Sequence, residues 1–135
     1  MFKKQLVSVA TIAVLTTGVA FAAVQQDKVM YKQADGTYVV NTTSLCSNVK
    51  GFKGTTPVEV YIKNNKVVKV EALPNREGPK FYDKVKQGLF PKFNGMKVSK
   101  AAKATSIDGV TGATYTSRAV KENVAAAVAY YKKNK

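Results

Sequence analysis

The fold is decided by Pro57–Leu73, which reads PVEVYIKNNKVVKVEAL. Apolar β-branched residues alternate with polar ones on both sides of its centre, and this period of two predicts two strands, each with one buried face. Asn64 and Asn65 separate the two runs, and because asparagine tolerates positive φ they predict a two-residue hairpin turn. The residues that we expect on the buried side are Val58, Val60, Ile62, Val67, Val68, Val70 and Ala72.

A further strand signal precedes the hairpin. Residues 33–40, QADGTYVV, place an Asp-Gly turn ahead of β-branched and aromatic residues, which predicts a strand. Residues 41–56 are rich in Ser, Thr, Asn and Gly and predict a loop with bends at Gly51 and Gly54. Together these segments predict an antiparallel meander with one buried face.

Two segments after the hairpin have the period of an amphipathic helix. Pro79 suits the first turn of a helix, and Phe81, Val85 and Leu89 then fall on one stripe. From Ser117 onward a second apolar stripe ends in lysines, which favour a helix C-terminus. The residues of this second stripe are Val120, Val124, Val128 and Tyr131. The chain therefore predicts an α+β fold, an antiparallel β-meander packed against two helices in a single domain.

Composition excludes several kinds of chemistry. The chain has 135 residues, enough for one modest core, and it lacks histidine, the commonest general base and metal ligand. Its one cysteine, Cys46, excludes thiolate clusters and structural zinc; we expect a buried free thiol, with a disulfide between chains as the alternative. We identify no metal ligands and no catalytic residues in the sequence.

The first residues resemble a targeting signal. Lys3 and Lys4 precede an uncharged apolar stretch at 6–21, and AFA at 20–22 offers the small residues that a signal peptidase reads. We therefore expect a signal peptide at 1–22, an N-terminal extension at 23–33 and the folded domain at 34–135. An uncleaved membrane anchor is the alternative; either way we expect an exported protein, periplasmic or at the cell surface.

Charge points to partners rather than to nucleic acid. Removal of residues 1–22 takes away two of the 22 basic residues and none of the eight acidic ones, which leaves a net charge of +12. Lysine dominates and is dispersed, whereas readers of nucleic acid favour arginine, so we expect no nucleic acid. An acidic redox protein or a membrane surface fits this charge better, and a solvated basic surface that only keeps the protein soluble is the alternative. We expect Lys63, Lys66 and Lys69, beside the hairpin turn, to steer the acidic partner.

A second informative stretch, IDGVTGATYTSR at 107–118, stands just before the last predicted helix. Its glycines permit close approach of a ligand, and the helix N-terminus behind it attracts anions. Four hydroxyl side chains add donors: Thr111, Thr114, Thr116 and Ser117. A simple helix cap at Thr116 or Ser117 explains the same residues equally well. Neither a P-loop nor a Rossmann fingerprint is present.

DGVTGAT at 108–114 matches the pattern Asp-x-x-Ser/Thr-Gly-Ala-Thr by which a flavin transferase recognises its targets. The chain resembles the FMN-binding domain family, found in the flavin subunits of Rnf and sodium-pumping NADH:quinone oxidoreductase complexes and in extracytoplasmic reductases. ADGTYVV, KGFKG and the hairpin follow the order of segments in that family, so the resemblance covers about residues 34–132. It implies FMN as the cofactor, esterified through its phosphate to Thr114; some relatives bind FMN without this bond.

The resemblance also implies the surroundings of the cofactor. The motif would contribute Asp108, Thr111, Gly112, Ala113, Tyr115, Thr116 and Ser117, and the REGPKF turn would contribute Glu77, Gly78 and Pro79. Gly78 stands where many relatives have threonine, so a hydrogen bond from that hydroxyl is missing here. Tyr115 could stack on the flavin ring or join the core. A phosphoester at Thr114 would lie beside the helix N-terminus, which stabilises its charge.

Three functions compete at this point. The first is an extracytoplasmic FMN protein that acts as an electron carrier in a membrane-associated redox chain and needs a flavin transferase to load it. The second is a small flavin-dependent reductase that acts on a soluble acceptor, and the third is a non-redox binding module with a basic surface. The carboxylates are expected to be isolated from one another, Glu59 and Glu71 in strands and Asp83 and Glu122 on helices, which favours a carrier over a self-contained enzyme.

Overall fold

The computed structural model describes residues 29–135, so the predicted signal peptide lies outside the described residues. Within this part of the chain four strands form one antiparallel sheet in the order β1-β2-β3-β4. The strands are β1 (Met30–Lys32), β2 (Tyr38–Asn41), β3 (Val58–Lys63) and β4 (Lys66–Ala72). Each strand thus pairs with its neighbour in sequence, which confirms the predicted meander and the α+β class.

The β3–β4 hairpin forms as predicted. Val58, Val60 and Ile62 are fully buried, whereas the residues between them are partly exposed. Asn64 and Asn65 have φ angles of 54° and 59°, the left-handed values that a two-residue turn of this kind requires at both positions. The alternation of side chains therefore fixes which face of the hairpin is buried, and the two asparagines close it.

Val68 departs from the predicted pattern. The pairing of β3 with β4 passes from Tyr61 opposite Lys69 to Ile62 opposite Val67, so Val68 is an extra residue at a β-bulge. Its side chain is 47% exposed, and the prediction that it is buried was wrong. Val67 and Val70 remain on the core side because the bulge shifts the alternation by one residue.

The sheet begins earlier in the chain than the strand signal indicated. β1 pairs with β2 through Met30 opposite Val40, so part of the segment assigned to an N-terminal extension belongs to the sheet. The Asp-Gly pair forms the turn between these two strands, with Gly36 at a φ of 92° and the Thr37 N–H donating to Asp35. The predicted strand at 33–40 is therefore a turn followed by the first residues of β2.

Helix α2 (Pro79–Gly88) has its proline in the first turn, as predicted. Tyr82 and Val85 are buried on its inner side, and Leu89 at its C-cap is buried too. Phe81 is 46% exposed, so its predicted place in the core was wrong. Tyr82, one residue further round the helix, is buried in its place. Phe81 lies instead near the N-terminus of α4.

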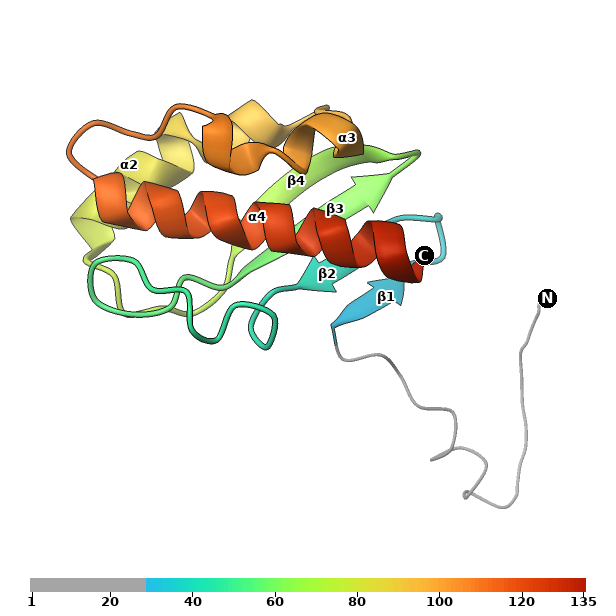
Figure 1. The fold of residues 1–135 in the computed structure, drawn as a ribbon, viewed down its shortest axis with the longest axis horizontal. Coiled ribbons are helices and arrows are strands. Elements are labelled where there is room, and N and C mark those ends of the chain that lie inside the picture. The colour runs from blue at the N-terminus through green and yellow to red at the C-terminus, as the bar shows by residue number, and fades with distance from the viewer. Residues whose placement is uncertain (1–28) are drawn as a thin grey trace, which may run out of the picture.

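Three short helical turns lead to α4 (Thr114–Asn134), which lies across the sheet (Figure 1). The short turns are η2 (Phe90–Phe93), α3 (Val98–Ala101) and η3 (Ala104–Ser106). The predicted stripe on α4 is buried throughout. Its start was placed too late, however: α4 begins at Thr114, with Ala113 at the N-cap and no side-chain cap. Thr116 and Ser117 therefore lie inside the first turn and do not cap the helix.

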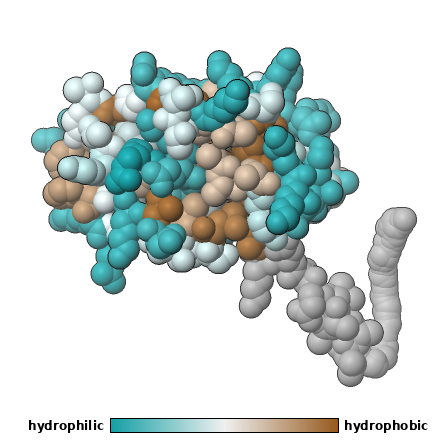
Figure 2. Space-filling view, in the orientation of Figure 1, coloured by the Kyte–Doolittle hydropathy of each residue, from teal (hydrophilic) through white to brown (hydrophobic). Residues whose placement is uncertain are grey.

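A single core joins the helices to one face of the sheet. α4 passes over β2 and β3 while α2 and α3 lie beside it, and Figure 2 shows apolar patches among hydrophilic side chains on this side of the molecule. Cys46 is free and buried, as expected. Among residues 29–135 no helix is long and apolar enough to cross a membrane, and no cluster of side chains there could hold a metal ion.

The hairpin turn provides a test of the fold. Because an ordinary L-residue in the left-handed region costs about 1 kcal/mol or more, Asn64→Ala should lower the free energy of unfolding by about 1 kcal/mol. Asn64→Gly, which adopts this φ without strain, should stay close to the parent. Urea denaturation of the three proteins measures the difference, and equal losses in both variants would contradict the backbone explanation.

Candidate functional site

Glu77 occupies the centre of the candidate site, at the end of the turn that follows β4. The turn is shaped by Asn75, whose side chain accepts a hydrogen bond from the Glu77 N–H at 3.0 Å. This places the Glu77 carboxylate inside the protein, where the residue is 6% exposed. A buried carboxylate needs several donors to compensate for the hydration that it loses.

Backbone amides of the loop at 51–54 supply three of these donors. The N–H groups of Phe52, Lys53 and Gly54 donate to the Glu77 carboxylate at 2.8, 2.6 and 3.1 Å. The loop closes on itself through the Gly51 N–H, which donates to the Gly54 carbonyl at 2.8 Å. A Cβ atom on Gly51 would lie 2.5 Å from Glu77 Oε1, so the cradle around the carboxylate requires glycine here.

Helix α4 supplies the fourth donor. Thr116 is 2% exposed, and its hydroxyl donates to Glu77 Oε1 at 2.5 Å. Burial raises the pKa of Glu77, but the hydrogen bonds from Thr116 and the loop amides outweigh it, so the pKa is lowered from the ordinary value. Glu77 is therefore charged at neutral pH, and it joins the loop at 51–54, the turn after β4 and the start of α4.

A cavity of about 320 Å³ opens where these three segments meet. Its walls include three aromatic side chains that stay largely outside the core, Phe52 at 67%, Phe81 at 46% and Tyr115 at 59% exposure. The rings of Phe52 and Tyr115 lie 6.3 Å apart at an angle of 30°. The remaining lining residues are Glu77, Gly78, Gly112, Ala113, Thr114 and Thr116. Exposed rings around a cavity suit a flat aromatic ligand.

The loop before α4 is held in place by side chains from two helical elements. Lys92 donates to the Asp108 carbonyl at 3.2 Å and Lys121 donates to the Ile107 carbonyl at 2.8 Å. The Ser117 hydroxyl accepts a hydrogen bond from the Val110 N–H at 3.0 Å. These contacts fix the path of the loop, so the residues that follow it enter the cavity wall in a set position.

The end of this loop forms an anion site. Gly112 has a φ of +86°, which glycine adopts without strain and which lets the backbone turn into α4. The N–H groups of Thr114, Tyr115 and Thr116 precede the first intrahelical bond of α4, from the Ser117 N–H, and so have no acceptor within the helix. The Lys84 ammonium lies 3.8 Å from where a Cβ on Gly112 would stand. Amide donors and a cation at one end of the cavity fit a phosphate group.

The four hydroxyl side chains of the motif differ in their surroundings. Thr116 and Ser117 are buried, and their hydroxyls are engaged with Glu77 and Val110. Thr111 is exposed but does not line the cavity, whereas Thr114 is exposed and lines it. Among the four, Thr114 alone combines access to solvent with a position in the cavity wall.

The structure thus brings together seven of the residues expected around the cofactor. These are Glu77, Gly78, Gly112, Ala113, Thr114, Tyr115 and Thr116. Asp108, Thr111, Pro79 and Ser117 lie outside the cavity lining. Tyr115 lines the cavity and is exposed, so of its two expected positions the core is excluded.

Sequence reasoning missed Phe52 and Lys84, and it gave Phe81 two conflicting places. Phe52 carries a readable signal, because a large apolar residue between two glycine-containing bends, in KGFKG, is unusual for a solvated loop. The helical period assigned Phe81 to the core stripe of α2, whereas the resemblance placed the REGPKF turn, which ends at Phe81, at the cofactor. No role was assigned to Lys84. Only the packing of α2 beside the loop at 107–113 places these two side chains at the cavity.

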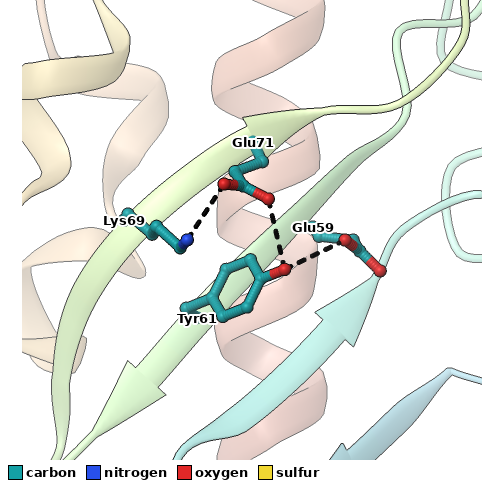
Figure 3. Close-up of polar contacts among 4 residues, drawn as sticks. All are labelled: Glu59, Tyr61, Lys69 and Glu71. Carbon is teal, nitrogen blue, oxygen red and sulfur yellow. Dashed lines mark hydrogen bonds and ion pairs between the residues drawn. The ribbon is translucent and has the colours of Figure 1, made fainter.

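Two strand carboxylates that we expected to be isolated lie together instead. Glu59 and Glu71 face each other across β3 and β4, and the Tyr61 hydroxyl lies 3.2 Å from an oxygen of each (Figure 3). Lys69 donates to Glu71 at 2.9 Å, and its ammonium lies 4.5 Å from the centre of the Tyr61 ring. Burial, followed by the two carboxylates, raises the pKa of Tyr61, so its hydroxyl stays protonated. This cluster is on the face of the sheet opposite α4.

Aromatic walls with amide donors and a cation at one end fit a flat ligand that carries a phosphate, as the cofactor of a flavoprotein does. The chain matches the model of the FMN-binding domain family over residues 51–129. It therefore belongs to the FMN-binding domain family, and FMN is its cofactor. No curated protein and no solved structure matches the chain. The matched range contains the loop at 51–54, Glu77, Lys84 and the start of α4.

The state of Glu77 predicts a pH dependence. Because its pKa is lower in the folded protein than the ordinary 4.5, its contribution to stability is complete above that pH and is lost as the pH falls through the folded value. Glu77→Gln, which removes the charge but keeps the shape, should cost about 2 kcal/mol at pH 7. The difference between parent and variant should shrink as the pH is lowered from 5 to 3.

Urea denaturation at a series of pH values measures this difference, and taking it between two proteins removes the contributions of Asp35 and Glu71, whose pKa values are also lowered. A difference that does not change with pH would show that folding does not lower the pKa of this carboxyl.

Proposed function

We propose that this protein is an extracytoplasmic electron carrier in which the FMN phosphate is esterified to Thr114. The observation that carries the attachment site is the position of Thr114: its side chain is exposed, lines the cavity and stands at the N-terminus of α4. A hydroxyl at this position meets both requirements of the reaction, access for a modifying enzyme and a nearby site for the resulting negative charge.

The attachment needs an activated flavin nucleotide and a flavin transferase. The Thr114 oxygen would attack the phosphorus of a flavin phosphoanhydride such as FAD, forming the Thr–O–P bond and breaking the anhydride bond. A nucleoside monophosphate leaves, the hydroxyl proton passes to a base or to solvent, and the flavin keeps its oxidation state. Thr116 cannot replace Thr114, because its hydroxyl is buried and held by Glu77.

Different residues of the cavity would hold the phosphate and the ring of FMN. The amides at the start of α4 and the Lys84 ammonium would bind the phosphate, and Phe52, Phe81 and Tyr115 would flank the ring. When bound, FMN supplies the transfer of one or two electrons, which no side chain of the cavity can perform. Glu77 holds the loop and the helix in position, since its oxygens are occupied by four protein donors.

Export is supported by the sequence of the first residues, in which two lysines precede an apolar stretch and small residues at 20–22. A covalent bond suits an exported carrier, because FMN that dissociates outside the cell is lost. The excess of basic residues supports an acidic redox partner in this compartment.

The attachment site can be tested directly. Protein co-expressed with a flavin transferase should carry one FMN on Thr114, which peptide mass spectrometry would locate, and its yellow colour should persist after denaturation. Thr114→Ala should abolish the covalent FMN, because the oxygen that forms the bond is gone. Thr116→Ala and Ser117→Ala should lower the yield without moving the site, since both act on the position of the helix.

Thr105→Ala is the matched control, because it removes an exposed hydroxyl that lies just before the motif and outside the cavity, and we expect full loading. An FMN adduct on Thr111, or complete loading of Thr114→Ala, would refute attachment at Thr114.

The aromatic walls make a separate prediction. In the Thr114→Ala background, adding Phe52→Ala should weaken non-covalent FMN binding by roughly three- to tenfold, because an aromatic contact contributes about 0.5–1.5 kcal/mol. Tyr31→Ala, which removes an exposed ring far from the cavity in sequence, should leave the affinity unchanged. Titration followed by flavin fluorescence gives both dissociation constants, and equal values would exclude Phe52 from the ring site.

A further inference from the structure

Two of the three lysines at the hairpin turn lie near carboxylates in the folded protein. Lys63 lies 3.9 Å from an oxygen of Asp35, and Lys69 lies 2.9 Å from an oxygen of Glu71. Lys66 forms no ion pair among the described residues. Nearby carboxylates therefore offset part of the charge by which these three lysines are expected to steer an acidic partner.

The cations around the mouth of the cavity are in a different situation. Lys53, Arg76, Lys80 and Lys84 are exposed, and none of them forms an ion pair within residues 29–135. Glu77, which follows Arg76, is buried and bonded to protein donors, and Asp83 of α2 pairs with Lys86 at 3.5 Å.

Each of these cations is tied to a residue of the cavity or its loop. Lys53 follows the cavity residue Phe52, and the Lys53 backbone N–H donates to Glu77. Lys80 stands next to Phe81 in the first turn of α2. The Cβ of Arg76 lies 3.8 Å from where a Cβ on Gly54 would stand, on the loop that holds Glu77.

Lys84 differs from the other three cations. Its ammonium lies beside Gly112, at the anion end of the cavity, and 6.0 Å from the centre of the Phe81 ring. There it would face the phosphate of bound FMN, whose negative charge would offset it. Lys53, Arg76 and Lys80 keep their charge available to another molecule. We call these three residues the mouth cations.

Exposed aromatic side chains line the same cavity. Phe52, Phe81 and Tyr115 are 46–67% exposed, and together with the cations they give the combination of aromatic rings and arginine that is enriched at protein interfaces. Electron transfer requires the partner to approach the cofactor closely, and the cavity mouth is where FMN is accessible.

We infer that the cavity mouth is the docking surface for an acidic redox protein, steered there by Lys53, Arg76 and Lys80. This inference rests on the proposed electron-carrier function. The surface is small and its charges are solvated, so it steers the encounter and does not hold the partner tightly. Carboxylates on the partner would face the mouth cations, and an apolar edge near its own cofactor would meet the aromatic rings.

Two variants of equal charge change test the location. The mouth variant carries Lys53→Ser, Arg76→Ser and Lys80→Ser; the hairpin variant carries Lys63→Ser, Lys66→Ser and Lys69→Ser. Both are loaded with FMN and mixed in a stopped-flow instrument, without oxygen, with a reduced acidic [2Fe–2S] ferredoxin as the probe. At low salt the mouth variant should be reduced on the order of tenfold more slowly than the parent, and the hairpin variant within about twofold of it.

Raising the salt to about 0.5 M should slow the parent and bring the three rates together, because exposed charges are then screened over a few ångström. A third variant that keeps the charge, Lys53→Arg, Arg76→Lys and Lys80→Arg, should retain the parent rate. The Lys53 substitutions leave its backbone N–H on Glu77, so absorbance and reduction by dithionite should be the same in all four proteins.

Equal low-salt rates in the parent and the mouth variant, or a larger loss in the hairpin variant, would overturn the docking site. A parent that is reduced by dithionite but not by the ferredoxin would also overturn it, while leaving FMN binding intact. A parent that carries no flavin after co-expression with the transferase would overturn the proposed function itself, and the docking site with it.

Discussion

The buried carboxylate of Glu77 is the constraint on which the rest of the site depends. An ionised group that loses its hydration must recover the lost hydrogen bonds from the protein, or it destabilises the fold. Here the donors come from a loop that precedes Glu77 by 23–25 residues and from a helix that follows it by 39. Satisfying one carboxylate therefore brings three distant segments to one point, and the cavity is the space enclosed where they meet. Gly51 is part of the same constraint, because any side chain there would collide with the carboxylate.

The position at which α4 begins then determines which hydroxyl groups of the motif are buried and which are exposed. A helix that started at Thr116 would have exposed this residue as a cap; starting at Thr114 turns it inward to Glu77 and leaves Thr114 outside. Two residues amount to about half a helical turn, so a shift of this size exchanges the inner and outer faces. The loop contacts of Lys92, Lys121 and Ser117 hold the start of the helix where it is. The chemistry available at the cavity thus depends on backbone placement more than on which hydroxyl residues the motif contains.

Local pattern was sufficient to predict the hairpin, its asparagine turn, the proline start of α2 and the buried stripe of α4, because each depends on residues within a few positions of one another. The bulge at Val68 could not be predicted from the sequence, because the register of β4 is set by its pairing with β3. Nor could the stripe of α2 distinguish Phe81 from Tyr82, which are neighbours on the helix surface. The motif indicated Thr114 and its surroundings, but the partners of Glu77 and the position of Lys84 arise from contacts between segments far apart in the sequence.

The pairing of charged side chains likewise depends on the folded structure and could not be predicted from the local sequence. In sequence the lysines are dispersed, and the total of +14 favours no part of the surface. In the fold, sheet register sets Glu59 opposite Glu71 and Tyr61 opposite Lys69, so the cations of the sheet face acquire carboxylate neighbours. An ion pair acts at a distance as a dipole, whose field falls off faster than that of a single charge, and salt screens what remains beyond about 8 Å. A molecule that approaches from solution therefore responds most to the cations without partners, and Lys53, Arg76 and Lys80 are the ones that lie around the cavity, whose aromatic walls are also exposed.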